Sequence, residues 1–214
     1  MYDLLLYSLY LLLITSGLVF SIVNRRQLGD FSKYMTILLG MVLLFESFDY
    51  IIKVEHANFL NHIYQPIEFT LMVLIYGRVL DYGWFRKVMI PMIVIFWSLS
   101  IYLSIFVEGI ENDNALSFVM GNFCIVIFAI IFHFQLLSNP SKEERLFRHP
   151  FFWINTAHLF FYLGTFFQMG FNAYLYERVP EVANSLMIIN YVLNLSLYSL
   201  YLVGFTCKQI FKSR

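Results

Sequence analysis

Seven stretches of mostly apolar residues run along the chain, separated by short segments that are richer in polar and charged residues. They cover residues 3–24, 32–54, 59–79, 86–107, 115–137, 150–174 and 182–209. Each is close to the ~20 residues that an α-helix needs to cross a bilayer. The pattern predicts an all-α, polytopic membrane protein, in which residues 1–214 form a single bundle of seven transmembrane helices.

The composition agrees with a chain that lies in lipid. Hydrophobic residues make up 60% of the sequence and charged residues only 13%, whereas soluble domains carry about 25% charged residues. The net charge of zero argues against nucleic acid as a partner, because a protein that binds nucleic acid needs a basic surface. The first expected partner is therefore the lipid bilayer. The chain is short and its connections are short, which favours a bacterial cytoplasmic membrane as its location.

The basic residues predict which side of the membrane each loop occupies. Twelve of the fourteen Lys and Arg lie near the connections after the first, third and fifth predicted helices or near the end of the chain. The two exceptions are Lys53 and Arg178. Cytoplasmic loops are enriched in Lys and Arg. We therefore expect the N-terminus outside and the C-terminus in the cytoplasm, which an odd number of spans requires.

The fourth stretch has few polar residues, and it divides the others into two groups of three. With seven spans, the two groups would share one orientation, a 3+1+3 arrangement of the kind found in transporters built from parallel repeats. The similarity between the two groups is faint, so this arrangement is an additional hypothesis.

Ionisable residues interrupt the second and third stretches. Glu46 and Asp49 lie in the second, and Glu68 lies in the third. Such residues cost roughly 2.5 kcal/mol or more each inside a membrane, and they therefore mark functional sites. In a hairpin that turns near residue 57, Glu46 would lie level with Glu68, and Asp49 level with Gln65. Two polar faces at matched depths are expected to meet each other or a shared cavity.

Polar residues of the sixth and seventh stretches lie in the same outer half of the predicted bundle. Together they suggest a pocket that opens to the outside and binds a small molecule, a cation or a proton. Its candidate residues are Glu46, Asp49, Tyr64, Gln65, Glu68, Thr165, Gln168, Asn190 and Asn194. The alternative is that the amides only bridge neighbouring helices, for about 0.6 kcal/mol each, and that Asp49 pairs with Lys53.

No catalytic, metal-binding or cofactor motif is evident. The sequence has no H-E-x-x-H and no G-x-S-x-G, which are the patterns expected of a zinc hydrolase and of a serine hydrolase. Lys208 lies at the inner end of the last stretch, too far from mid-membrane for a retinal linkage. His133 and His158 give only a weak signal for haem. We therefore expect no cofactor and no enzymatic activity.

Two classes of function remain. The preferred hypothesis is a ligand-binding or sensory module with an outward-facing polar pocket. It would signal to a cytoplasmic partner through the basic segment 142–148 or the C-terminal helix. The alternative is a small secondary transporter that is coupled to protons through Glu46 and Glu68.

Overall fold

The computed structural model describes residues 2–52, 58–112, 114–138, 146–178 and 180–211. Side chains are described for residues 6–48, 59–112, 114–138, 146–171 and 188–211. Throughout these segments the chain is helical apart from short turns, and no strand occurs in them. The prediction of an all-α chain is confirmed.

The long helices coincide with the apolar stretches of the sequence. They are α1 (Tyr2–Val23), α3 (Ser32–Ile52), α4 (Asn58–Val79), α5 (Gly83–Tyr102), α6 (Ala115–Leu137), α8 (Pro150–Arg178) and α9 (Pro180–Ile210). Shorter elements join them: α2 (Arg25–Leu28), the π-helix η1 (Leu103–Glu108), which prolongs α5, and the 3-10 helix η2 (Leu146–Arg148). Helix boundaries thus follow the alternation of apolar runs and polar connections.

Four of the described helical segments are both long and apolar enough to cross a membrane. They are Leu6–Val23, Gly83–Glu108, Ala115–Leu137 and Ile188–Ile210. The chain is therefore a membrane protein. The helices α3, α4 and α8 are long as well. A complete seven-span topology stays a prediction.

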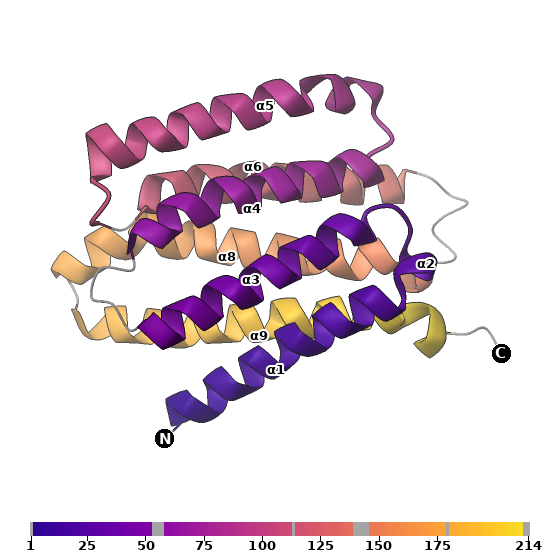
Figure 1. Ribbon diagram of the computed structural model, residues 1–214, viewed down its shortest axis with the longest axis horizontal. Helices are drawn as coiled ribbons and strands as arrows, with labels where there is room; N and C mark the ends of the chain where they lie inside the picture. The colour runs from indigo at the N-terminus through magenta and orange to yellow at the C-terminus, as the bar shows by residue number, and fades with distance from the viewer. Residues whose placement is uncertain (1, 53–57, 113, 139–145, 179, 212–214) are drawn as a thin grey trace.

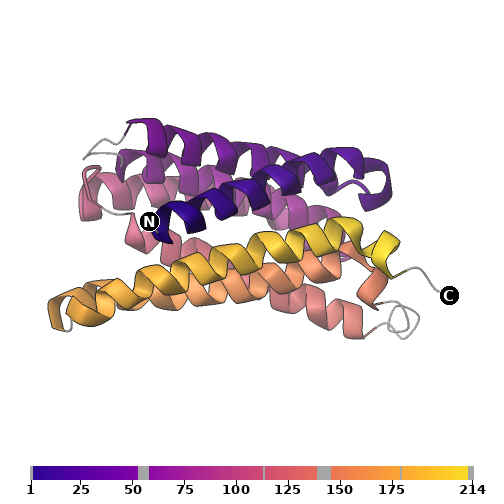
Figure 2. The ribbon, with the colours of Figure 1, turned by 90° about the horizontal axis from the view of Figure 1, so that it is seen from below.

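The helices run roughly parallel to the long axis of the molecule, with α5 at one edge (Figure 1). Turned by 90°, the bundle shows α8 and α9 as an antiparallel pair (Figure 2), and their packing is the most extensive between any two described elements. The helix α1 packs on α3 and α9, whereas α4 packs on α3, α5 and α6. The edge position of α5 agrees with its lack of charged residues beyond Lys87.

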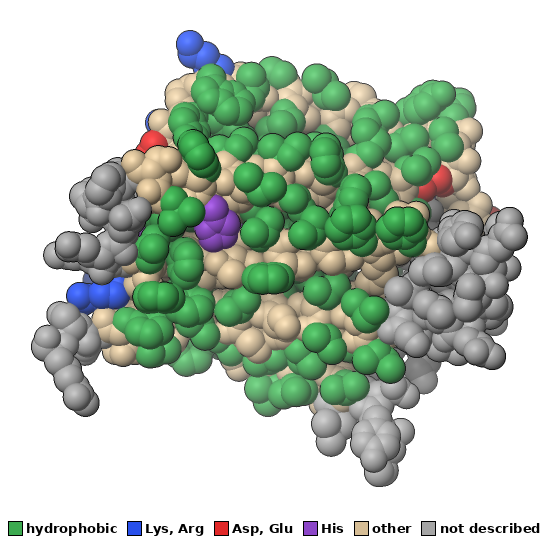
Figure 3. Space-filling model, turned by 180° about the vertical axis from the view of Figure 1, so that it is seen from behind, with side chains coloured by type: hydrophobic (Ala, Val, Ile, Leu, Met, Phe, Trp, Pro, Cys, Tyr) green, Lys and Arg blue, Asp and Glu red, His purple; other side chains and the backbone are tan. Residues whose placement is uncertain are grey.

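Apolar side chains occupy both the interior and the outer surface. Buried residues such as Met35, Met72 and Phe151 form the core, while Ile90 and Phe106 are almost three-quarters exposed. In the space-filling view, hydrophobic side chains cover the middle of the face, and the visible Lys and Arg lie along its left edge (Figure 3). Such an apolar surface is expected where lipid tails surround the helices.

Candidate functional site

A cavity of about 400 Å³ lies between the helices near the end of the bundle at which α4, α6 and α9 begin. Six helices contribute to its wall. The lining residues are Tyr10 of α1; Val42, Phe45 and Glu46 of α3; Leu60, Asn61, Tyr64 and Glu68 of α4; Ala115, Phe118 and Asn122 of α6 with the preceding Asn114; Phe161, Tyr162, Thr165 and Met169 of α8; and Asn190, Asn194, Leu197 and Tyr198 of α9. The wall therefore combines carboxyl, amide and hydroxyl groups with aromatic rings.

Glu68 is the most deeply buried acidic group of this wall, with 6% of its surface exposed. The hydroxyl of Tyr162 donates a hydrogen bond to Glu68 Oε1 over 2.8 Å, and Tyr64 also interacts with this carboxyl. Among the described residues, no Lys, Arg or His forms an ion pair with it. Glu68 thus links α4 to α8 through neutral hydroxyl groups alone.

Glu46 links α1 to α3 on another side of the cavity. The Tyr10 hydroxyl donates to Glu46 Oε1 over 2.7 Å, and the Tyr7 hydroxyl donates to the Glu46 carbonyl oxygen over 3.2 Å. The ring of Tyr10 also meets that of Tyr198 edge to face, with 5.5 Å between the ring centroids. These contacts hold three helices around the Glu46 side chain.

Amide groups complete the polar part of the wall. Asn122 Nδ2 donates to Thr165 Oγ1 over 3.0 Å, and Asn194 Nδ2 lies 3.0 Å from Asn190 Oδ1. Asn114 Nδ2 donates to the carbonyl oxygen of Asn61 over 3.3 Å. Asn114 Oδ1 is buried without a hydrogen-bond partner. Asn114 therefore carries an acceptor that the described protein atoms do not use.

Most of the candidate residues from the sequence lie together in this wall, namely Glu46, Tyr64, Glu68, Thr165, Asn190 and Asn194. Gln65 is fully buried but does not line the cavity; its Nε2 approaches Gly121 of α6. Gln168 is half-buried and also outside the lining set. The side chain of Asp49 lies outside the described residues.

Several lining residues were not among the candidates, and Tyr10 and Asn114 are two of them. Tyr10 lies in an apolar stretch where a tyrosine does not stand out from its neighbours. Asn114 lies in a connection, just before the first residue of α6. Only the packing of α1 and α6 against the other helices brings these two side chains into the cavity wall.

A second buried polar cluster lies deeper in the bundle, around His158. The Tyr76 hydroxyl donates to Asn155 Oδ1 over 2.7 Å, and it lies 3.1 Å from His158 Nδ1. Since the only proton of that hydroxyl is already donated, Nδ1 must carry the proton of the ring. His158 Nε2 then accepts from the Tyr201 hydroxyl at 2.7 Å. The cluster joins α4, α8 and α9, and every ring nitrogen of His158 is used.

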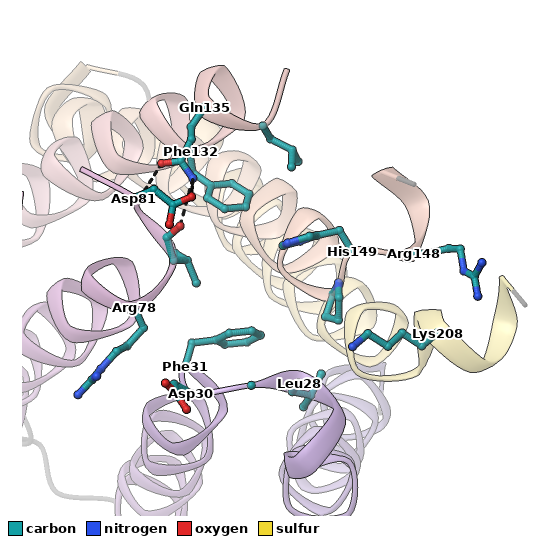
Figure 4. A pocket seen from close by; sticks show the side chains of 14 residues that line it. Leu28, Asp30, Phe31, Arg78, Asp81, Phe132, Gln135, Arg148, His149 and Lys208 are labelled. Carbon is teal, nitrogen blue, oxygen red and sulfur yellow. Dashed lines mark hydrogen bonds between the residues drawn. The ribbon is translucent and has the colours of Figure 1, made fainter. Parts of the chain in front are cut away.

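A wider pocket of about 690 Å³ lies at the opposite end of the bundle (Figure 4). Its wall mixes acidic and basic groups. The Asp81 backbone N–H donates to Gln135 Oε1 over 2.8 Å, and Lys208 Nζ donates to the carbonyl oxygen of Gln27 over 2.5 Å. Arg148 points away from the middle of this pocket (Figure 4). This charge distribution does not favour one class of ligand.

Comparison with protein-family models, with curated proteins and with solved structures found no match to this chain. Among the described residues, no three His, Cys, Asp or Glu side chains come together as metal ligands would.

Proposed function

We propose that this chain is a seven-span membrane protein that binds a small ligand in the carboxyl-lined cavity and signals to a cytoplasmic partner. With the topology predicted from the basic residues, the cavity lies in the outer half of the bundle. The observation that carries the proposal is Glu68 of α4, a carboxyl that is buried in the cavity wall. In the proposed topology α4 lies in the membrane. A carboxyl in such a place is costly and is kept where it has a function.

The helices that line the cavity also reach the cytoplasmic end of the proposed topology. The helix α9 carries Asn190 and Asn194 in the cavity and Lys208 at the other end. It packs along α8, which carries Tyr162 and Thr165. A ligand that shifts these two helices would therefore move the surface at which a partner could read the change.

Transport is the second candidate, and one observation favours it. The cavity and the wider pocket lie at opposite ends of the same bundle. Between them lie the His158 cluster and a group of three buried rings, in which Phe151 meets Phe31 and Phe132 with centroid distances of 5.0 Å and 4.8 Å. A secondary transporter closed in its middle has this layout. Uptake of a bound ligand into proteoliposomes would establish transport.

Ligand binding is tested with the purified full chain and a panel of small metabolites of every charge class, with melting temperature as the readout. A ligand at about 100 times its Kd stabilises the folded state by about 2.7 kcal/mol. Ala115→Trp would place a large ring in the cavity, whereas Leu116→Trp places the same ring at an exposed neighbouring position on the same helix.

We expect at least one compound to raise the melting temperature of the unaltered protein and of Leu116→Trp, but not of Ala115→Trp. If no compound distinguishes the two variants, the cavity is not a ligand site and the proposal fails.

A further inference from the structure

We propose that the cavity takes an organic cation, a protonated amine or a quaternary ammonium group that carries an apolar substituent. This inference rests on the proposed function, namely that the cavity binds a ligand. It adds the charge and the chemical class of that ligand. Three features of the wall carry it: the carboxyl of Glu68 without a basic partner, the unused acceptor of Asn114 and the aromatic rings.

The first feature is an acidic group without a cationic partner. Glu68 is 6% exposed and receives hydroxyl hydrogen bonds, with no basic side chain paired to it among the described residues. None of the described lining residues is a Lys, Arg or His. A buried carboxylate is stable only when it is paired or hydrogen-bonded. A cation in the cavity would supply the charge that the wall lacks.

The second feature is independent of the carboxyl groups. Asn114 is 1% exposed and lines the cavity, and its Oδ1 has no hydrogen-bond partner. A buried acceptor without a partner is costly, because it has lost its hydrogen bond to water. The ammonium group of a protonated amine has only donors, so it pairs with an acceptor such as this oxygen or with a carboxylate. An anionic ligand would satisfy neither.

The third feature is the aromatic part of the wall. The rings of Tyr10 and Tyr198 meet edge to face, and those of Phe45 and Tyr64 do the same at 5.1 Å between centroids. Aromatic faces attract cations, and aromatic cages are the usual means of binding quaternary ammonium groups. The rings also offer apolar surface for the substituent of the amine.

The same wall does not suit a bare metal ion. Ca²⁺ takes six to eight oxygen ligands at about 2.3–2.6 Å around one point. The described residues bring no three acidic, His or Cys side chains together. The volume of about 400 Å³ falls within the range of small-molecule sites, which is roughly 300–1,000 Å³. The inferred ligand is therefore an organic cation.

The test compares probes of one shape and different charge on the purified full chain, by calorimetry and by melting temperature. The probes are 2-phenylethylamine, 2-phenylethanol, 3-phenylpropanoate and benzyltrimethylammonium, with calcium chloride as the metal control. We expect the two cations to bind at least about tenfold more tightly than the alcohol. The protonated amine donates charge-assisted hydrogen bonds to a carboxylate, and the quaternary ammonium group, which has no N–H, is attracted by the carboxylate charge and by the aromatic faces. The carboxylate probe should not bind.

Two variants locate the site. Glu68→Gln keeps the shape and the hydrogen-bonding capacity of the side chain, and we expect it to weaken binding of the cations by about tenfold or more. Asp81→Asn removes an acidic group at the opposite end of the bundle and should bind the cations like the unaltered protein.

Equal binding of the alcohol and the amine, with loss in Ala115→Trp, would overturn the cation but leave the ligand-binding function intact. Stabilisation by calcium alone would overturn it in favour of a metal site. Failure of both cations to bind would overturn it directly, whatever the metabolite panel shows. The comparison of probes needs no variant, so the inference stays testable if Glu68→Gln fails to fold.

Discussion

The Tyr162 hydroxyl lies 2.8 Å from Glu68 Oε1, and this hydrogen bond joins α4 to α8 at the wall of the cavity. The two residues are 94 positions apart in the sequence, and both are almost completely buried. The bond fixes the carboxyl at the cavity wall instead of leaving it free to turn between helices. A ligand would meet a preoriented acidic group there.

Removal of this hydroxyl should destabilise the protein. Tyr162→Phe leaves the ring in place but deprives a buried carboxyl of a donor, which we expect to cost about 1–3 kcal/mol. Tyr102→Phe is the matched control, because Tyr102 is 54% exposed. Unfolding in mixed micelles would show the difference. Equal stability of the two variants would mean that the bond to Glu68 contributes nothing.

The cluster around His158 should behave as one unit. Tyr76→Phe leaves Asn155 Oδ1 and His158 Nδ1 without the hydroxyl, and Tyr201→Phe deprives Nε2 of its donor. Groups in one network couple by about 0.5–3 kcal/mol. We therefore expect the double variant to deviate from the sum of the two single effects by such an amount. Strict additivity in a double-mutant cycle would show that the two tyrosines act independently.

Close packing between α8 and α9 predicts an intolerant glycine. A Cβ on Gly204 would lie 2.9 Å from the carbonyl oxygen of Pro150, which belongs to the backbone and cannot turn aside. Overpacking of this kind costs typically about 1–3 kcal/mol, so Gly204→Ala should lower the melting temperature. Gly40→Ala, where a Cβ meets nothing within 4 Å, should be neutral or slightly stabilising. The reverse order of the two melting temperatures would contradict the helix packing.

Topology is tested by single cysteines in a chain whose Cys124 and Cys207 are replaced by alanine. Glu111, Lys33 and Ser138 are all exposed. In the seven-span topology, Glu111→Cys should react with an impermeant maleimide on intact cells. Lys33→Cys and Ser138→Cys should react only after permeabilisation. Labelling of all three from the same side would contradict the proposed topology.

The sequence predicted the helices well because each apolar run is bounded by polar connections. It also predicted that Glu46 and Glu68 share one cavity, since the two residues lie equally far from the predicted hairpin turn near residue 57. Gln65 is different because it follows Tyr64 by one residue, a rotation of about 100° around the helix. That rotation turns its side chain toward Gly121 of α6 and away from the cavity.

The contribution of α1 could not be predicted. Tyr10 looks like any aromatic residue of a membrane helix, and its role depends on α1 packing against both α3 and α9. The hydrogen bond to Glu46 and the ring contact with Tyr198 follow from that packing. A periodic pattern within one helix carries no information about which helix it will meet.

The most direct test of the account is whether the cavity is reached from outside and attracts cations. Asn194→Cys places a thiol in the cavity wall, and Val192→Cys, on the same helix, places one on the exposed apolar surface. In the chain without native cysteines, intact cells are treated with methanethiosulfonate reagents that carry a positive or a negative charge. Acidic clefts concentrate cations, so Asn194→Cys should react from outside, and faster with the cationic reagent. Val192→Cys should stay unreactive. Reaction of Asn194→Cys only after permeabilisation, or faster with the anionic reagent, would contradict the account.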